Sequence, residues 1–145
     1  MITINSKSPS ETQKAGKYYA KKCIEKGDII GLNGELGSGK TVFVKGIAGY
    51  ISVKDTINSP TYLIVNEYKG IHPVSKINLN IYHFDFYRIN DPSELDIIGF
   101  KEYLNNENSI SLIEWSRLAE EYLNIILKKV YFDYGNEENS RRIKY

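Results

Sequence analysis

The fold is predicted most directly by residues 34–41, which read Gly34-Glu35-Leu36-Gly37-Ser38-Gly39-Lys40-Thr41. This stretch matches the pattern G-x-x-x-x-G-K-[ST] of phosphate-binding loops at every fixed position. Glycines allow successive backbone N–H groups to turn toward a phosphate, because no Cβ stands in the way. The stretch therefore predicts a loop that binds the phosphates of a nucleotide. The competing interpretation is an unrelated glycine-rich turn before a helix.

The flanks of this stretch agree with a phosphate-binding loop. A short apolar run at 28–32 predicts a buried strand before it, and a helical pattern follows from about Lys40 to Ile51. The free N–H groups and positive dipole end of that helix would face the anion. We expect Lys40 to reach the β- and γ-phosphates and the Thr41 hydroxyl to hold Mg²⁺.

The rest of the chain predicts strands that alternate with helices. Strands are expected at 2–4, 62–68, 79–86 and 110–113, with a flexible connection at 69–73 and a terminal hairpin at 130–134 and 141–145. Helices are expected after capping boxes at Ser8 and Asp91, ending near Gly27 and Gly99, with further helical turns at 103–104 and 118–122. This order predicts an α/β fold of the P-loop NTPase type, a single domain over residues 1–145. Its central sheet is expected to be mostly parallel, flanked by helices, with antiparallel edge strands.

Composition narrows the class of protein. The 145 residues carry 19 Lys and Arg against 18 Asp and Glu, a net charge of +1 with both His neutral. That balance argues against a broad nucleic-acid-binding face, although it leaves room for a local basic patch. The single Cys23 makes neither an internal disulfide nor a Cys-rich metal site. We expect a cytoplasmic protein without membrane contact, because no stretch approaches ~20 apolar residues and the N-terminus lacks a signal-peptide pattern.

Two of the predicted strands end in an acidic residue, Asp85 and Glu114. The carboxyl ends of parallel strands meet at one edge of a sheet, which is also the edge of the phosphate-binding loop. We expect Asp85 to contact Mg²⁺ directly or through water. We expect Glu114 to orient or activate the attacking water, or to make a second contact to the metal. Either acid alone is also compatible with a helix cap or a solvated strand end.

Several neighbouring residues keep two interpretations each. His83 is a hydrogen-bonded structural residue or a catalyst, and Arg88 contacts phosphate or pairs with an acid. Trp115 is a core residue, or it covers the nucleotide or a partner. Ser59 and Thr61 lie in a segment that either senses the γ-phosphate or forms an ordinary turn.

Taken together, these segments resemble the TsaE family, small bacterial ATPases needed to make threonylcarbamoyladenosine (t6A) in tRNA. The resemblance is carried by residues 34–41, Ser59-Pro60-Thr61-Tyr62, His83-Phe84-Asp85-Phe86-Tyr87-Arg88 and Glu114-Trp115. It covers essentially the whole chain, and the last two strings make it specific, since the loop alone occurs in a very large superfamily.

The resemblance implies a P-loop domain that binds ATP and Mg²⁺, hydrolyses ATP weakly alone, and resets or regulates a complex of TsaB and TsaD. It implies only indirect contact with tRNA, because TsaD transfers the threonylcarbamoyl group. It assigns catalysis to Lys40, Asp85 and Glu114, and metal binding to Thr41, Asp85 and Glu114. It assigns nucleotide contacts to Glu35, Leu36, Gly37, Ser38, Gly39, Lys40, Thr41, Val42, Thr61 and Trp115.

Two other functions stay open from the residues alone. One is a small P-loop kinase that phosphorylates a small molecule, and the other is a nucleotide-gated binding module. Kinases of this kind usually carry an arginine-rich lid that clamps the transferred phosphoryl group. This chain has only four arginines, Arg88, Arg117, Arg141 and Arg142, and two of them lie in the predicted terminal hairpin.

Overall fold

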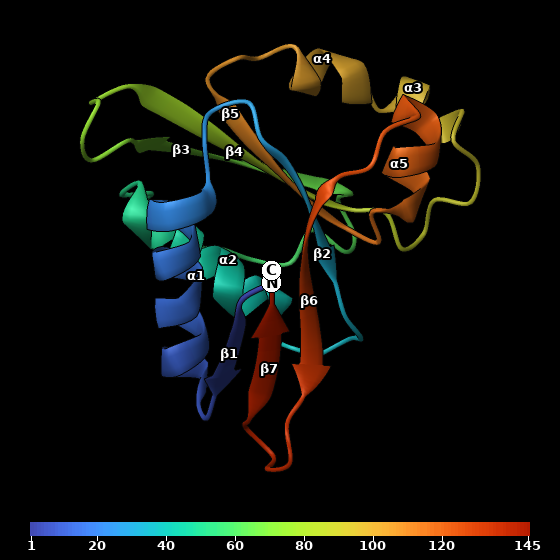
Figure 1. The fold of residues 1–145 in the computed structure, drawn as a ribbon. Helices are drawn as coiled ribbons and strands as arrows, with labels where there is room; N and C mark the ends of the chain where they lie inside the picture. Colours follow the sequence, from blue (N-terminus) through green and yellow to red (C-terminus); the bar gives the residue numbers. More distant parts are fainter.

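A seven-stranded sheet runs through the protein (Figure 1). A computed structural model describes residues 1–145 and orders the strands β1-β7-β6-β2-β5-β4-β3. The strands are β1 (Thr3–Ser6), β2 (Ile29–Asn33), β3 (Val65–Ile71), β4 (Asn78–Asp85), β5 (Ser109–Glu114), β6 (Lys128–Tyr134) and β7 (Arg141–Lys144). Strands β4, β5, β2 and β6 pair in parallel, whereas β3 pairs antiparallel with β4, and β7 pairs antiparallel with β6 and β1. The predicted α/β fold is confirmed, with a mixed sheet in which the four central strands are parallel and the outer strand pairs are antiparallel.

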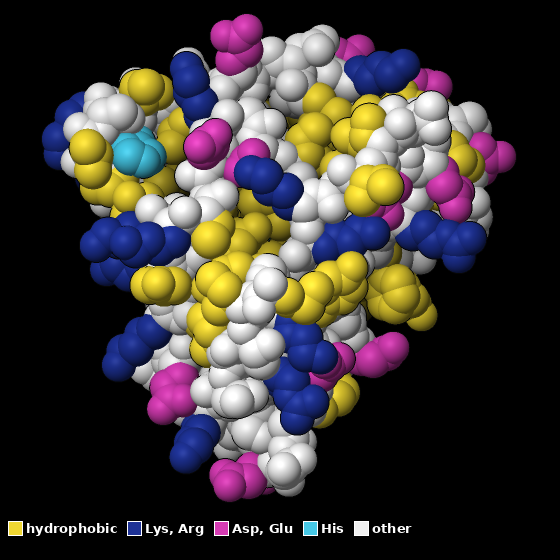
Figure 2. Space-filling view, in the orientation of Figure 1, with side chains coloured by type: hydrophobic (Ala, Val, Ile, Leu, Met, Phe, Trp, Pro, Cys, Tyr) yellow, Lys and Arg dark blue, Asp and Glu magenta, His cyan; other side chains and the backbone are white.

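Helices cover both faces of this sheet. Helices α1 (Pro9–Cys23) and α2 (Lys40–Tyr50) lie side by side on one face, and α3 (Glu94–Ile97), α4 (Phe100–Leu104) and α5 (Arg117–Leu123) lie over the other (Figure 1). Because the sheet is covered on both sides, all six residues of the central strand β5 are buried, including the polar Ser109, Ser111 and Glu114. None of the helices combines the length and apolar character needed to cross a membrane. Figure 2 shows basic and acidic side chains interspersed over the visible surface, in keeping with the balanced charge.

Side-chain alternation along β4 and β5 directs the polar strand ends to the α1/α2 face. Residues two apart in a strand point to the same side of the sheet. His83 and Asp85 therefore follow Ile81, which belongs to the core cluster shared with α1 and α2. Asp85 pairs in register with Glu114 of β5, so the two side chains lie next to each other on that face.

The start of α1 confirms the first predicted cap. The Ser8 hydroxyl accepts a hydrogen bond from the Glu11 N–H at 3.2 Å, and Pro9 opens the helix. The Glu11 carboxylate accepts from the N–H of Lys7 at 2.7 Å, one residue earlier than in an ideal capping box.

Several element boundaries differ from the sequence-based predictions. Helix α1 ends at Cys23 rather than near Gly27, because Ile24 is already extended. Strand β3 begins at Val65 rather than Tyr62, since the N–H groups of Leu63 and Ile64 bond to the carbonyl of Pro60 in a turn. It continues to Ile71, so residues 69–71 are strand and not a flexible connection.

The predicted helix at 91–99 is also shorter than expected. The Asp91 carboxylate accepts from the N–H of Ser93 at 2.8 Å within a turn, and α3 spans only Glu94–Ile97. The terminal hairpin exists, but it does not add two antiparallel edge strands. Strand β6 pairs in parallel with β2 inside the sheet, β7 alone is antiparallel to β6, and β1 closes the edge.

Helices α1 and α2 approach each other through glycine. A Cβ on Gly46 of α2 would lie 2.0 Å from the Gln13 carbonyl oxygen and 2.7 Å from the Lys17 nitrogen. A Cβ on Gly16 of α1 would lie 2.1 Å from the Phe43 carbonyl oxygen. The two backbones are thus in direct contact, which holds α2, and with it Lys40, in place against α1.

This contact predicts a strong effect of a single methyl group. We expect Gly46→Ala to lower the free energy of unfolding by about 1–3 kcal/mol, because the helices must separate to admit the Cβ. Chemical denaturation measures the change. Gly49→Ala is the matched control, since a Cβ there meets nothing within 4 Å. It should be neutral or gain about 0.5–1 kcal/mol from helix propensity, and equal losses in the two variants would refute the close approach.

Candidate active site

The glycine-rich loop, residues 34–39, joins β2 to α2 at the carboxyl edge of the sheet. Gly37 and Gly39 have φ values of +75° and +101°, a backbone region that residues with a Cβ rarely adopt. Gly39 is the N-cap of α2 and supplies no side-chain cap. The N–H groups of Lys40, Thr41 and Val42 have no acceptor within the protein. The start of α2 therefore presents a set of free backbone donors suited to an anion.

Lys40 lies beneath this loop with only 6% of its side chain exposed. Its ammonium group donates hydrogen bonds to the carbonyl oxygens of Gly34 at 2.6 Å and Glu35 at 2.9 Å. Its Nζ is also 3.9 Å from Oε2 of Glu114. A lysine has three N–H donors, so two hold the loop in its curved form and one stays available for a ligand.

The end of the β6–β7 hairpin supports the loop from the other side. The Tyr134 hydroxyl donates to the carbonyl oxygen of Leu36, and the Arg141 guanidinium donates to the carbonyl oxygen of Gly37 at 3.1 Å. The Arg141 guanidinium also lies 5.1 Å from the centroid of the Tyr134 ring. Sequence reasoning missed both residues, because only the position of β6 beside β2 brings the hairpin to the loop.

Asp85 and Glu114 end the neighbouring strands β4 and β5, and both are nearly buried. Asp85 accepts a hydrogen bond from the Tyr87 N–H at 3.0 Å through Oδ1 and from the Thr61 hydroxyl at 3.2 Å through Oδ2. Glu114 Oε1 lies 3.0 Å from Nε2 of His83. The Glu114 carboxylate thus lies near the buried ammonium of Lys40, and both acids line the same cavity at the ends of the parallel strands.

These groups line one cavity of about 450 Å³. All but one of the predicted site residues contribute to its wall: Glu35, Leu36, Gly37, Gly39, Lys40, Thr41, Val42, Thr61, Asp85, Glu114 and Trp115. Ser59 and Tyr87 complete the lining. Ser38 is the exception, because it is buried beneath the loop with a hydroxyl that has no hydrogen-bond partner.

The structure shows where Trp115, Arg88 and His83 lie, each of which had two interpretations from the sequence. Trp115 is 41% exposed, so it is not a core residue, and its ring lies 5.0 Å from that of Tyr87 at the rim of the cavity. The Arg88 guanidinium lies 4.7 Å from the centroid of the Tyr62 ring. His83 is fully buried and contacts Glu114.

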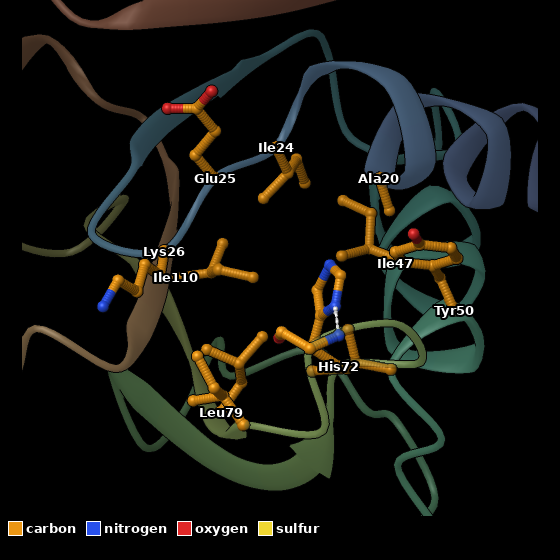
Figure 3. Close-up of a pocket in the computed structure, with 12 residues that line it drawn as sticks. Ala20, Ile24, Glu25, Lys26, Ile47, Tyr50, His72, Leu79 and Ile110 are labelled. Atoms are coloured by element: carbon orange, nitrogen blue, oxygen red, sulfur yellow. Dashed lines mark hydrogen bonds between the residues drawn. The ribbon is translucent and has the colours of Figure 1, made fainter.

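A second cavity, of about 460 Å³, lies between α1, α2 and the connection from β3 to β4 (Figure 3). Most of its lining is apolar, including Ile24, Ile47 and Leu79. Figure 3 shows the ring of His72 directed into this cavity. Nδ1 of the ring accepts hydrogen bonds from the backbone N–H groups of Val74 and Ser75 in the β3–β4 connection. None of the predicted site residues lines this second cavity. The buried charged groups and the free N–H donors of α2 therefore meet at the first cavity, not at the second.

Comparison with known proteins identifies the family that this chain resembles. The family model described as threonylcarbamoyl adenosine biosynthesis protein TsaE matches residues 6–143. The tRNA threonylcarbamoyladenosine biosynthesis protein TsaE of Haemophilus influenzae is 38% identical over 124 residues, 83% of this chain and 74% of that protein. The TsaE protein of Bacillus subtilis is 38% identical over 122 residues, 83% of this chain and 68% of that protein. The crystal structure of Bacillus subtilis YdiB superposes with a TM-score of 0.74 at 27% identity, covering 98% of this chain and 82% of that one.

Support of the loop by the hairpin can be tested with two adjacent arginines. We expect Arg141→Gln to increase the mobility of residues 36–39, because the hydrogen bond to the Gly37 carbonyl is lost. Backbone ¹⁵N relaxation measures this as a fall in the order parameters of these amides. Arg142→Gln is the matched control, since Arg142 is an exposed neighbour in β7 and the hydrogen bond to the loop comes from Arg141. The same loss of order in both variants would contradict a specific role of Arg141.

Proposed function

This chain belongs to the TsaE family of threonylcarbamoyl adenosine biosynthesis proteins, and on that premise we propose that it is an ATPase with a P-loop NTPase fold. In this proposal, ATP hydrolysis serves the formation of t6A in tRNA. The observation that supports it best is the meeting of Lys40, Asp85 and Glu114 with the free N–H groups of α2 around one cavity.

The phosphates of ATP are assigned to the glycine-rich loop and the start of α2. Backbone N–H groups at a helix N-terminus bind anions through hydrogen bonds and the helix dipole. The remaining N–H donor of Lys40 adds a full positive charge from below. Because Lys40 is already held by two loop carbonyls, it is oriented before the ligand arrives, and little ordering is needed on binding.

The metal is assigned to Thr41, Asp85 and Glu114, whose oxygen atoms are the kind of ligand that Mg²⁺ prefers. The chain forms no preformed cluster of three or more His, Cys, Asp or Glu side chains. One hydroxyl and two carboxylates nevertheless fit Mg²⁺, which commonly takes one or two carboxylates from the protein and completes its shell with water and substrate phosphates. When bound, Mg²⁺ supplies positive charge at the phosphate oxygens. Asp85 is held for this contact by the N–H of Tyr87 and the hydroxyl of Thr61.

Glu114 is assigned to the water that attacks the γ-phosphorus. In hydrolysis, the water oxygen bonds to this phosphorus while the bond to the leaving oxygen of ADP breaks, which gives ADP and phosphate. A carboxylate in the cavity wall can accept a hydrogen bond from that water and so hold it in line. Glu114 is 5% exposed, which limits its access to bulk water.

The partners proposed for this chain are TsaB and TsaD, with tRNA reached through them and the reaction placed in the cytoplasm. Three large apolar side chains of the cavity lining are exposed, namely Leu36 (85%), Tyr87 (63%) and Trp115 (41%), and Tyr62 (83%) follows the lining residue Thr61. An exposed apolar rim of this kind is typical of a surface that another protein covers. We propose that the TsaB–TsaD complex covers it and thereby accelerates turnover.

The positions of the arginines favour an ATPase over a small-molecule kinase. Arg117 pairs with Glu121 on α5 at 3.0 Å, and Arg141 holds the Gly37 carbonyl. Arg88 lies over the ring of Tyr62. These three side chains are therefore engaged with the protein itself rather than gathered in a lid over the cavity.

The proposal is tested by measuring phosphate release from ATP with the purified chain, alone and with the TsaB and TsaD proteins of the same organism. We expect ATP to be converted to ADP and free phosphate, with no phosphorylated acceptor molecule. We expect phosphate release to be faster when both partner proteins are present. A phosphorylated metabolite would identify a kinase instead. Nucleotide-dependent partner binding in a wild-type chain that never turns over ATP would identify a binding module.

Removal of the buried ammonium should weaken nucleotide binding. We expect Lys40→Ala to raise the dissociation constant for ATP by about 10- to 100-fold, the value of one charge-assisted hydrogen bond of about 1.5–3 kcal/mol. Isothermal titration calorimetry measures it, with thermal unfolding as a check on the fold. Lys45→Ala is the control, because Lys45 is exposed on the same helix. An unchanged ATP titration for Lys40→Ala would exclude the assignment.

Replacement of Asp85 should affect turnover more than binding. We expect Asp85→Asn to lower Mg²⁺-dependent phosphate release by at least about tenfold, because a negative charge near the metal is lost. ATP affinity without Mg²⁺ should stay within about threefold of wild type, since the amide keeps the size of the side chain. Steady-state hydrolysis over a Mg²⁺ titration measures both effects, with the exposed Asp133→Asn as control. Hydrolysis at the wild-type rate in Asp85→Asn would remove Asp85 from the site.

A further inference from the structure

His83 is a fully buried residue next to the two acids, and it has no part in the hydrolysis proposed above for Lys40, Asp85 and Glu114. We propose that His83 is a positioning residue for Glu114. Its Nε2–H donates a hydrogen bond to Oε1 and thereby keeps Oε2 at the cavity, 3.9 Å from the Lys40 ammonium rather than in a tight ion pair with it. The task of Glu114 itself rests on the proposed function, whereas the hydrogen bond between His83 and Glu114 does not.

The position of His83 excludes direct contact with a ligand. Its side chain is 0% exposed and does not line the cavity. It extends from β4 on the α1/α2 face, two residues before Asp85, and its Nε2 lies 3.0 Å from Oε1 of Glu114 on β5. Any influence of His83 on bound nucleotide therefore passes through Glu114.

The surroundings of Nδ1, the ring nitrogen that does not face Glu114, indicate which nitrogen of His83 carries the hydrogen. Nδ1 is buried and has no hydrogen-bond partner. If Nδ1 carried the hydrogen, a buried N–H would be unsatisfied, and the lone pair of Nε2 would face the negative oxygen of Glu114. With the hydrogen on Nε2, the ring instead makes a charge-assisted hydrogen bond to the carboxylate. The contacts of both nitrogens thus favour the Nε2–H tautomer.

The consequence for Glu114 follows from its two oxygen atoms. Oε1 is engaged by His83, and Oε2 lies 3.9 Å from Lys40, which is longer than a hydrogen bond. Without His83, the flexible glutamate side chain would be free to rotate and close onto the ammonium of Lys40 as a tight ion pair. Both groups would then be turned away from the ligand. His83 therefore keeps the carboxylate and the ammonium apart and available.

The test compares two substitutions at position 83. His83→Phe keeps an aromatic ring without a donor, and His83→Gln places an amide N–H near the position of Nε2. We expect His83→Phe to lower kcat for ATP hydrolysis by about 10- to 100-fold, as for other residues that orient an active-site group. KM should change by less than about threefold, and His83→Gln should recover most of kcat. His72→Phe, which changes the other histidine of the chain, is the control and should leave kcat unchanged.

A double substitution separates positioning from a general structural effect. If His83 acts through Glu114, His83→Phe should cause no further loss of kcat in a Glu114→Ala background. An equal loss in both backgrounds would overturn the inference and leave the proposed function intact. Wild-type turnover by Glu114→Ala would instead count against the proposed task of Glu114, and the positioning role would fall with it.

Nuclear magnetic resonance of the nucleotide-free protein provides a readout independent of activity. In ¹⁵N-labelled protein, we expect the imidazole signals of His83 to show the Nε2–H tautomer, with a slowly exchanging Nε2–H. The His72→Phe variant leaves His83 as the only histidine, which makes the assignment unambiguous. An Nδ1–H tautomer would overturn the inference. This test uses wild-type position 83, so it remains decisive even if His83→Phe does not fold.

Discussion

The buried ammonium group of Lys40 is the constraint on which the site depends. A charge removed from water is costly unless hydrogen bonds and an opposite charge surround it. Here the carbonyl oxygens of Gly34 and Glu35 and the carboxylate of Glu114 provide these partners. Because the three partners come from the glycine-rich loop and from β5, satisfying one charge brings the loop, the start of α2 and the end of β5 together.

Support for this arrangement extends away from the cavity in two directions. Below it, His83 contacts Glu114, and across the sheet edge Asp85 is held by the N–H of Tyr87 and the hydroxyl of Thr61. Above it, Tyr134 and Arg141 hold the carbonyl oxygens of the glycine-rich loop. Such outer contacts orient the groups that would touch a ligand, so a preformed site needs little reorganisation on binding.

Much of the fold and most of the site could be predicted from the sequence, because the signals are local. The glycine pattern of residues 34–41, the acids at the ends of apolar strands and the cap at Ser8 each depend on neighbours within a few residues. The errors arose where a distant contact prevails over a local preference. Strand β3 continues to Ile71 because it pairs along its whole length with β4, and β6 runs parallel because it lies beside β2.

The sequence by itself determined that a glycine-rich loop joins a strand to a helix, and that two acidic strand ends lie near this loop. Backbone freedom and apolar periodicity are properties of short segments, so they can be read without a structure. Only the tertiary structure decided which side chains hold the site in place. The contacts of Glu114 with His83, of Leu36 with Tyr134 and of Gly37 with Arg141 join residues 31, 98 and 104 positions apart. Contacts over such separations depend on how the strands are ordered in the sheet, which no local pattern specifies.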